Sequence, residues 1–417
     1  MFGKTELRMI ENDEDLRVAC QEMASSPVIG VDTESDSFYH YQEKVCLVQI
    51  STLEADYIID PLQLRGLEPL AGLLEDPAVT KILHGADYDI VCMKRDFGIS
   101  IRNIFDTMVA AQFLGFPRVG LADLIHRYFG IRPDKKYQRH DWSQRPLLED
   151  HLQYARGDTH WLLAIHEVLL YRLAQADRLE AALEECALVE QREWTGRTSS
   201  DADFLKLKGA GTLDTDGLRV LRKLWEYREG VAKRMDRPSF KAIPGDTLLH
   251  VAHRRPLDLD EMAECVRPSS SLFRQHGPPM VAAVKAGLDD PRPLPEPEAK
   301  APRSGSGHRG SPNEALLTRL KAWRNQIVDS QRIAPVVVAS NQLLKEVAIV
   351  QPTDLAELAS LESVRTWQVK SWGEQILAIV AEGRHDGPAN PKGRRRRRRK
   401  NGDAQGGEAQ GGEAQGE

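Results

Sequence analysis

Residues 28–35, VIGVDTES, place an apolar run directly before two carboxylates, Asp32 and Glu34, that are one residue apart. Valine and isoleucine at this density predict a buried β-strand. Successive side chains of a strand point to opposite faces, so Asp32 and Glu34 would lie side by side on one face. Such a pair either turns the chain into solvent or binds a hard cation such as Mg²⁺ or Mn²⁺ through oxygen ligands. The second interpretation requires further carboxylates elsewhere in the chain.

Length and composition indicate a globular protein of several domains. The chain has 417 residues, of which 41% are apolar and 28% charged, and this length predicts about two to four domains. The first twenty residues carry acidic side chains and no apolar block, so we expect no signal peptide. No apolar run approaches the roughly 18 residues of a membrane span. The five cysteines lack CxxC spacing, which argues against a zinc site and a disulfide framework and favours a reducing compartment, cytoplasmic or nuclear.

The first two hundred residues mix strand-like and helical segments. Residues 28–34, 44–52 and 55–60 predict successive strands, and residues 80–85 predict another. Helical spacing is found in residues 67–77 and 89–97. This order predicts an α/β domain with a mixed sheet.

After Ala182 the chain is helical and contains an internal repeat. Trp225, Pro238 and PLDLDEM in the first copy correspond to Trp323, Pro335 and PTDLAEL in the second, and from Leu248 onward the offset is a constant 96 residues. Two copies of one small helical bundle explain this register, while the alternative is a single larger helical lobe. Residues 291–312, rich in Pro, Gly and Ser, predict a linker.

The charge of the chain is unevenly distributed. From residue 384 onward nine basic and five acidic residues give the tail a charge of +4, which leaves −10 for the rest of a chain whose net charge is −6. The tail has no core residues and is expected to be disordered. It should attract a polyanion locally, whereas the body should not.

Further carboxylates follow the first pair. Asp87, Asp89 and Asp106 lie near the fourth predicted strand, and residues 150–170 predict one amphipathic helix. Tyr154 and Asp158 are four residues apart and therefore on one face of that helix. A tyrosine and a carboxylate on a helix, beside a strand that carries two more carboxylates, are what a metal site with an oriented water requires.

Three motifs together resemble the DEDD superfamily of 3′-5′ exonucleases, whose fold is ribonuclease H-like. They are DTE at residues 32–34, HGADYD at 84–89 and YARGD at 154–158. The tyrosine four residues before the last Asp is typical of the tyrosine subclass. Within it, HGADYDI, IFDT and DWSQRPLLEDHLQYARGDTHWLL are similar to the ribonuclease D family over roughly residues 6–180. The helical repeats are similar to the HRDC domain found in helicases and ribonuclease D.

This resemblance implies a domain order. We expect a ribonuclease H-like catalytic domain over residues 1–190 and HRDC-like helical domains over 208–290 and 313–383. The linker would span residues 291–312 and the disordered basic tail residues 384–417. The acidic ligands of the family fall on Asp32, Glu34, Asp89 and Asp158, and the tyrosine that orients water falls on Tyr154; Asp87 and Asp106 are expected to be structural.

The chemistry implied by the family is two-metal hydrolysis of phosphodiester bonds. Two divalent ions, Mg²⁺ or Mn²⁺, would be held by the four carboxylates, and nucleoside 5′-monophosphates would leave the free 3′ end of an RNA such as a tRNA precursor. With an ordinary pKa near 10, Tyr154 would orient the water rather than act as a base.

One segment has the composition of a nucleic-acid contact. Residues 126–145 contain six Lys and Arg, two Asp and four interleaved aromatic residues, which suits a single-stranded backbone with stackable bases. A solvated loop has a similar composition, so that alternative stays open. The candidate RNA contacts are His84, Lys135, Lys136, Tyr137, Arg139, Trp142 and Arg145, with Arg394, Arg395 and Arg396 in the tail.

Several alternatives to an exoribonuclease remain. A related 3′-5′ exonuclease could act on DNA, although the paired HRDC-like bundles and the absence of polymerase or helicase sequence favour RNA. A catalytically silent RNA-binding scaffold would be expected to lose a carboxylate, and a DNA-repair adaptor would bind duplexes without Mg²⁺. The role of the HRDC-like copies is open, and the Arg run is either a nucleic-acid tether or a localisation signal. We expect a monomer in a bacterial cytoplasm, with no membrane association and no protein partner indicated.

Overall fold

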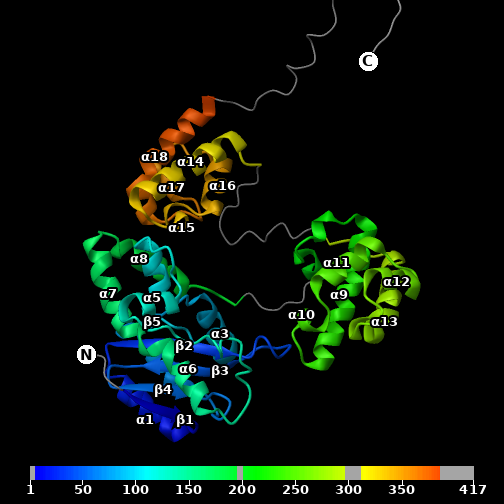
Figure 1. Cartoon of the computed structure of the whole chain (residues 1–417). Helices are drawn as coiled ribbons and strands as arrows, with labels where there is room; N and C mark the ends of the chain where they lie inside the picture. The colour runs from blue at the N-terminus through cyan, green and yellow to red at the C-terminus, as the bar shows by residue number, and fades with distance from the viewer. Residues whose placement is uncertain (1–4, 195–200, 296–310, 386–417) are drawn as a thin grey trace, which may run out of the picture.

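The computed structural model describes residues 5–194, 201–295 and 311–385 (Figure 1). A six-stranded sheet with the order β1-β4-β3-β2-β5-β6 forms the centre of the N-terminal domain. Its pairings are mixed: β2 is antiparallel to β3 and parallel to β5, which confirms the predicted mixed sheet. The strands are β1 (Glu6–Ile10), β2 (Val28–Ser35), β3 (Val45–Ser51), β4 (Ala55–Ile59), β5 (Thr80–Leu83) and β6 (Ile104–Asp106).

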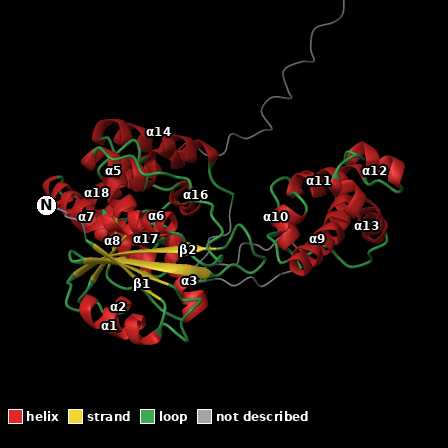
Figure 2. Ribbon diagram, turned by 60° about the horizontal axis from the view of Figure 1, so that its bottom comes forward, coloured by secondary structure: helices red, strands yellow, loops and turns green. Residues whose placement is uncertain are grey.

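Helices cover both faces of the sheet (Figure 2). Leu16 of α1, Leu70 of α2 and Ile90 of α3 share one core with Val31 of β2, whereas α6 contacts β2, β3 and β4 from the other face. Because side chains alternate along β2, the residues next to Val31 face α6. The helices of this domain are α1 (Asp13–Met23), α2 (Glu68–Leu74), α3 (Asp87–Phe97), α4 (Thr107–Phe113), α5 (Leu121–Phe129), α6 (Glu149–His160), α7 (Leu162–Gln175) and α8 (Leu179–Glu190).

The single helix predicted over residues 150–170 is divided in two. Helix α6 ends at His160 and α7 begins at Leu162, with Trp161 between them. The break lies against the centre of β2, where a Cβ on Gly30 would be 3.0 Å from the Thr159 carbonyl oxygen and 3.3 Å from Leu162 Cβ. No Pro or Gly lies at the break, and apolar residues recur with helical spacing on both sides of it. The sequence therefore predicted one continuous helix over residues 150–170.

The two helical repeats have the same five helices in the same order. Arg255 and Gln351, 96 residues apart, both have positive φ, and Asp258 and Asp354 both cap the N-terminus of the helix that follows. Two short 3-10 helices, η1 (Asp203–Lys206) and η2 (Ala210–Thr212), precede the first bundle. The first bundle contains α9 (Thr215–Met235), α10 (Ser239–Ala242), α11 (Gly245–Arg254), α12 (Leu259–Cys265) and α13 (Ser271–Leu288); the second contains α14 (Glu314–Gln331), α15 (Pro335–Val338), α16 (Asn341–Val350), α17 (Leu355–Ala359) and α18 (Thr366–His385).

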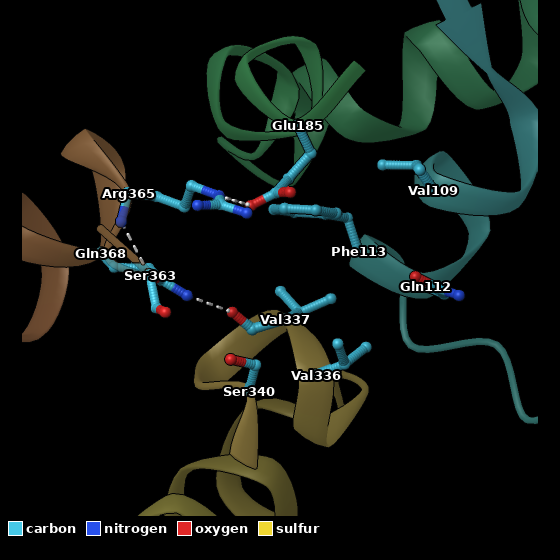
Figure 3. Close-up of a pocket in the computed structure, with 10 residues that line it drawn as sticks. All are labelled: Val109, Gln112, Phe113, Glu185, Val336, Val337, Ser340, Ser363, Arg365 and Gln368. Carbon is cyan, nitrogen blue, oxygen red and sulfur yellow. Dashed lines mark hydrogen bonds and ion pairs between the residues drawn. The ribbon is translucent and has the colours of Figure 1, made fainter. Parts of the chain in front are cut away.

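The second bundle shares its core with the N-terminal domain. One continuous apolar cluster includes Phe113 of α4 together with Leu320 and Trp372 of the bundle, whereas the first bundle has a core of its own. Arg365 donates to Glu185 of α8 at 2.8 Å across this interface (Figure 3). The cavity drawn there has a volume of about 100 Å³, which is too small for a nucleotide. The second bundle therefore completes the N-terminal domain rather than standing apart from it.

The first bundle contacts the loop that follows β2, which spans residues 36–44. His40 Nδ1 lies 2.7 Å from an Asp236 carboxylate oxygen, and the Tyr41 hydroxyl donates to Glu229 at 3.1 Å. In Figure 1 this loop reaches from the sheet toward α10. The strand that carries Asp32 and Glu34 is thus joined to the first bundle by the loop at its end.

The predicted RNA contacts of the tail, Arg394, Arg395 and Arg396, belong to residues 386–417, which lie outside the described residues. Within residues 5–194, 201–295 and 311–385 no single helix is both long and apolar enough to cross a membrane; the bent pair formed by α14 with α15 and α16 meets the criterion by length and composition only.

Candidate active site

Four carboxylates converge between β2, α3 and α6. Asp32 and Glu34 extend from β2 toward α6, Asp89 lies in the first turn of α3, and Asp158 lies on α6. The three others each raise the pKa of Asp32 by charge repulsion, in addition to the effect of burial, which is larger. Side chains from three separate elements are therefore within electrostatic reach of one another, as the motifs predict.

The burial of this cluster raises the pKa of every carboxyl group in it. The pKa of Glu34 is raised well above its usual range by burial and by repulsion from Asp158 and Asp89. Burial raises the pKa of Asp158 to about 7, and that of Asp89 to about 6 in spite of a hydrogen bond from the Thr33 hydroxyl. These shifts mean that the cluster favours a proton or a cation over four free charges.

The chemistry of this donor set suits divalent cations. Carboxylate oxygens are the ligands that Mg²⁺ and Mn²⁺ prefer, and a cation would relieve the repulsion that raises the pKa of Asp32. Among the described residues, no three His, Cys, Asp or Glu side chains are already closed into a coordination shell.

A cavity of about 360 Å³ opens beside the cluster. Tyr154 and Asp158 of α6 form one wall, while Tyr137 and Lys136 approach from the loop before α6. Burial and the charges of Asp158, Glu34 and Asp32 raise the pKa of the Tyr154 hydroxyl. The phenol therefore stays protonated, which agrees with an orienting role and not with that of a base. The rest of the lining is Ile131, Pro133, Asp134, Asp150, Gln153, Gly157 and Trp161.

Of the predicted RNA contacts, Lys135, Lys136 and Arg139 are exposed and Tyr137 is partly exposed. Lys136 Nζ lies 4.6 Å from the centre of the Tyr137 ring, so a cation and an aromatic ring occur together at the cavity. This arrangement keeps these four residues as candidates.

Trp142, in contrast, is only 1% exposed and presents no ring face to a base. Its ring packs against Tyr154 with centroids 5.9 Å apart. The indole N–H lowers the pKa of Glu34, although Nε1 has no aligned hydrogen-bond partner. Trp142 was predicted to contact RNA, and the structure instead makes it part of the wall that holds Tyr154 and Glu34.

Arg145 and His84 are also engaged inside the protein. Arg145 donates to the buried Asp60 at 2.7 Å and to the Cys46 carbonyl at 3.1 Å, so its guanidinium is not available to RNA. His84 Nδ1 lies 2.9 Å from Thr107 Oγ1, its Nε2 is buried, and burial lowers its pKa to about 4. It is a neutral internal residue, and the prediction that it contacts RNA is not supported.

Asp87 and Asp106 have the structural roles that were expected. Asp87 pairs with Arg192 at 2.7 Å on the surface. Asp106 caps α4 and accepts hydrogen bonds from the backbone N–H groups of Gly85 and Ala86 at 3.0 and 2.9 Å. Asp106 thereby fixes the turn that leads into α3 and Asp89.

Sequence reasoning missed Gln49, which pairs directly with Asp32 across β2 and β3. Directly paired residues on neighbouring strands point to the same face, so Gln49 faces α6 beside the carboxylates. Its side chain is completely buried, and both amide atoms lack a hydrogen-bond partner among the described residues. Buried amides are rarely left unpaired without a reason. The only available signal was a polar residue inside the apolar run VCLVQIS.

Comparison with known proteins places this geometry in a family. Residues 7–174 match the model of the 3′-5′ exonuclease domain, and residues 217–284 and 313–380 each match the HRDC domain. Ribonuclease D of Gluconacetobacter diazotrophicus is 30% identical over 376 residues, which cover 89% of this chain and 92% of that protein. The chain belongs to the ribonuclease D family. In this chain the exonuclease domain precedes the two HRDC domains.

Two further relatives extend the comparison. The crystal structure of Escherichia coli RNase D, described as an exoribonuclease involved in structured RNA processing, superposes with a TM-score of 0.69 at 26% identity and covers 91% of this chain and 99% of that one. Exosome complex component 10 homolog of Drosophila melanogaster is 32% identical over 306 residues, 72% of this chain. This chain spans only 34% of the length of that relative. The ribonuclease D arrangement is therefore similar over nearly the whole chain, and the exosome component over one part of it.

Proposed function

We propose that this ribonuclease D family member is a metal-dependent exoribonuclease that removes nucleoside 5′-monophosphates from the 3′ end of RNA. The observation that carries the proposal is the convergence of Asp32, Glu34, Asp89 and Asp158 next to Tyr154 at the edge of a cavity. The family and the E. coli RNase D structure support RNA as the substrate class.

The carboxylates and the tyrosine have different tasks in the proposal. Asp32, Glu34, Asp89 and Asp158 would hold two divalent ions, Mg²⁺ or Mn²⁺. When bound, such ions supply an activated water and stabilise the leaving oxygen of an in-line displacement at phosphorus. The protonated Tyr154 hydroxyl orients the attacking water, and the buried Trp142 ring keeps Tyr154 in place.

The cavity beside Tyr154 would receive the terminal nucleotide. Tyr137 and Trp161 offer aromatic surface for a base, and Lys136 offers a charge for phosphate. Lys135 and Arg139 on the same exposed loop would contact the backbone further along the strand. Precursors of tRNA are the proposed physiological substrates; the expected cytoplasmic location and monomeric state stay predictions.

The test is degradation of 5′-labelled and 3′-labelled RNA and DNA oligonucleotides by the full chain with Mn²⁺. Release of mononucleotides from the 3′ end of RNA is expected, and EDTA should abolish it. Asp89→Asn should abolish activity, whereas Asp87→Asn should not, because Asp87 in the same helical turn pairs with Arg192 at the surface. This pair of variants separates a metal site from a general need for acidic residues in α3.

Three outcomes would contradict the proposal. Equal degradation of RNA and DNA would favour the related DNA exonuclease. Tight RNA binding without cleavage by the wild-type chain would favour the silent scaffold. Full activity in excess EDTA would remove the role assigned to the four carboxylates.

A further inference from the structure

An aromatic and basic surface lies where the loop after β2 meets the first helical bundle. Phe38 of the loop and Phe240 of α10 are 40% and 53% exposed, although both are large apolar side chains. Their rings meet edge to face with centroids 6.5 Å apart. We call the surface made of Phe38, Tyr39, Arg139, Phe240 and Lys241 the aromatic seam. Nothing in the catalytic cluster accounts for it.

The aromatic seam carries two cations on its rings. The Arg139 guanidinium carbon lies 5.7 Å from the centre of the Phe38 ring, and Lys241 Nζ lies 4.3 Å from the centre of the Tyr39 ring. Neither Arg139 nor Lys241 forms an ion pair with a carboxylate within the described ranges. Exposed rings interleaved with uncompensated positive charge match the composition of a single-stranded nucleic-acid surface.

The nearby acidic groups are already engaged with other partners. Asp236 lies 2.7 Å from His40 Nδ1, and Glu229 accepts from the Tyr41 and Ser239 hydroxyls. Asp141 accepts from the Ser143 hydroxyl at 2.6 Å. These carboxylates fix the loop, and among the described residues none of them is in ion-pair contact with Arg139 or Lys241, so both cations can contact a phosphate.

The loop that carries Phe38 and Tyr39 is held in place from two sides. The Tyr39 hydroxyl donates to the Arg139 carbonyl at 2.7 Å, which ties the loop after β2 to the loop before α6. The contacts of His40 and Tyr41 with the first bundle tie the same loop to α9. A platform whose rings are fixed before binding loses little entropy when bases stack on it.

The seam lies close to the proposed reaction centre. Phe38 is the fourth residue after Glu34, so their Cα atoms are at most about 14 Å apart even if the chain is fully extended. A strand whose 3′ end lies in the cavity beside Tyr154 needs only a few further nucleotides to span such a distance. We propose that the aromatic seam binds the single-stranded segment of RNA a few nucleotides upstream of the 3′ end. This inference rests on the proposed function, since it names where the same substrate continues.

The inference is tested by RNA binding to the full chain in EDTA, where no cleavage is needed for a signal. Phe38→Ala combined with Phe240→Ala should weaken binding of an unstructured RNA of about 16 nucleotides by about tenfold or more, and leave binding of one of about 4 nucleotides unchanged. Arg139→Gln and Lys241→Gln should each lower the slope of log affinity against log salt by about 0.7. Because the readout is affinity, a failure of catalysis leaves this test intact.

Two matched variants keep the test decisive. Leu53→Ala with Tyr171→Ala removes two apolar side chains that are each 67% exposed elsewhere in the catalytic domain, and it should bind both RNAs like the wild type. Phe38→Trp with Phe240→Trp keeps the stacking surface and should restore binding of the longer RNA. Restoration would show that the alanine pair fails through lost stacking and not through misfolding.

Three results would overturn the inference. They are unchanged binding of the longer RNA by the alanine pair, an equal loss for both RNA lengths, and failure of the tryptophan pair to restore binding. Sedimentation supplies an independent criterion. If the wild type were a dimer and the alanine pair a monomer, the seam would bind a second copy of the chain and not RNA.

Discussion

Asp32 and its three carboxylate neighbours form a site in which like charges repel one another. Burial raises the pKa of all four groups, and repulsion from the other carboxylates raises the pKa of Asp32 and Glu34 further, so the metal-free protein is least stable when all four are ionised. A cation or a proton removes the same repulsion. Catalytic competence and metal-free stability therefore change in opposite directions at these positions.

Removing one charge should stabilise the metal-free protein. The pKa of Asp158 is about 7 when folded, against an ordinary value of 3.8, so folding takes up protons between about pH 4 and pH 7 and loses stability as pH rises through that window. In EDTA at pH 8, Asp158→Asn should raise the melting temperature by about 2–4 °C for each kcal/mol of repulsion removed, and the gain should vanish near pH 4. Thermal unfolding in EDTA at both pH values measures this. A gain of equal size at pH 4 and pH 8 would contradict it; Asp87→Asn is the control.

Substitution of Gln49 should likewise raise the stability of the metal-free protein and lower its activity. Its completely buried amide has no partner among the described residues, and an unsatisfied buried polar group costs about 1–3 kcal/mol. Gln49→Leu should therefore raise the melting temperature in EDTA while reducing Mn²⁺-dependent nuclease activity, because Gln49 lies beside Asp32. Calorimetric titration with Mn²⁺ would show whether metal affinity changes too. Full activity in a stabilised variant would mean that the amide serves no purpose at the site.

Among the elements, β2 and α6 determine whether the carboxylates meet. Gly30 lies two residues before Asp32 in β2 and is therefore on the same face, toward α6. Because it has no side chain, the end of α6 can approach the strand closely. The Ser51 hydroxyl on β3 donates to Thr159 at 2.7 Å and fixes the register of the helix on the sheet. The position of Asp158 thus depends on small side chains on the strands.

Gly30→Ala should separate α6 from β2. The new Cβ would lie 3.0 Å from the Thr159 carbonyl oxygen, and such overpacking typically costs about 1–3 kcal/mol. We expect a lower melting temperature and a larger loss of kcat than of RNA affinity, since Asp158 would shift while the binding loop would not. Gly72→Ala in α2, where a Cβ meets nothing within 4 Å, is the control. If both variants behaved alike, the close approach at Gly30 would not matter.

Sequence reasoning predicted the elements whose patterns are local. The central strands β2, β3, β4 and β5 have clear apolar runs, and the spacing of Tyr154 and Asp158 required only a helix. β1 and β6 were missed because ELRMI in β1 has charged residues in place of a continuous apolar run, and β6 has only three residues. The burial of Trp142 and the ion pair of Arg145 with Asp60 depend on tertiary packing, which the sequence does not show. The whole aromatic and basic segment of residues 126–145 was therefore predicted to contact RNA, although only part of it is exposed.

At the scale of the whole molecule, the second bundle is anchored and the first is not part of the same core. The anchoring depends on a close backbone approach at Gly115, where φ is +71° and a Cβ would lie 1.5 Å from the Arg332 carbonyl oxygen. The backbone N–H groups of Thr366 and Trp367 donate to Glu184 at 2.7 and 3.2 Å. The catalytic domain and the second bundle therefore behave as one packed body.

Gly115→Ala should loosen that body. A side chain there cannot be accommodated without moving the second bundle, whereas Gly98, with a φ of +69°, has open space around its Cβ position. Gly98→Ala should cost only the strain of a left-handed residue, about 1 kcal/mol, and Gly115→Ala should cost clearly more. Limited proteolysis should then cleave the second bundle of Gly115→Ala faster than that of Gly98→Ala. Identical cleavage patterns would contradict the rigid interface.

The shared core also determines when the protein can finish folding during its synthesis. Domains generally fold from the N-terminus as the ribosome releases them, but here Phe113 and Leu169 are buried against a bundle that ends with α18 at His385. The exonuclease domain must therefore wait, with apolar surface uncovered, until nearly two hundred further residues have been translated. A chain that terminates early would expose that surface, and it would be a substrate for chaperones and proteases before it could reach an RNA.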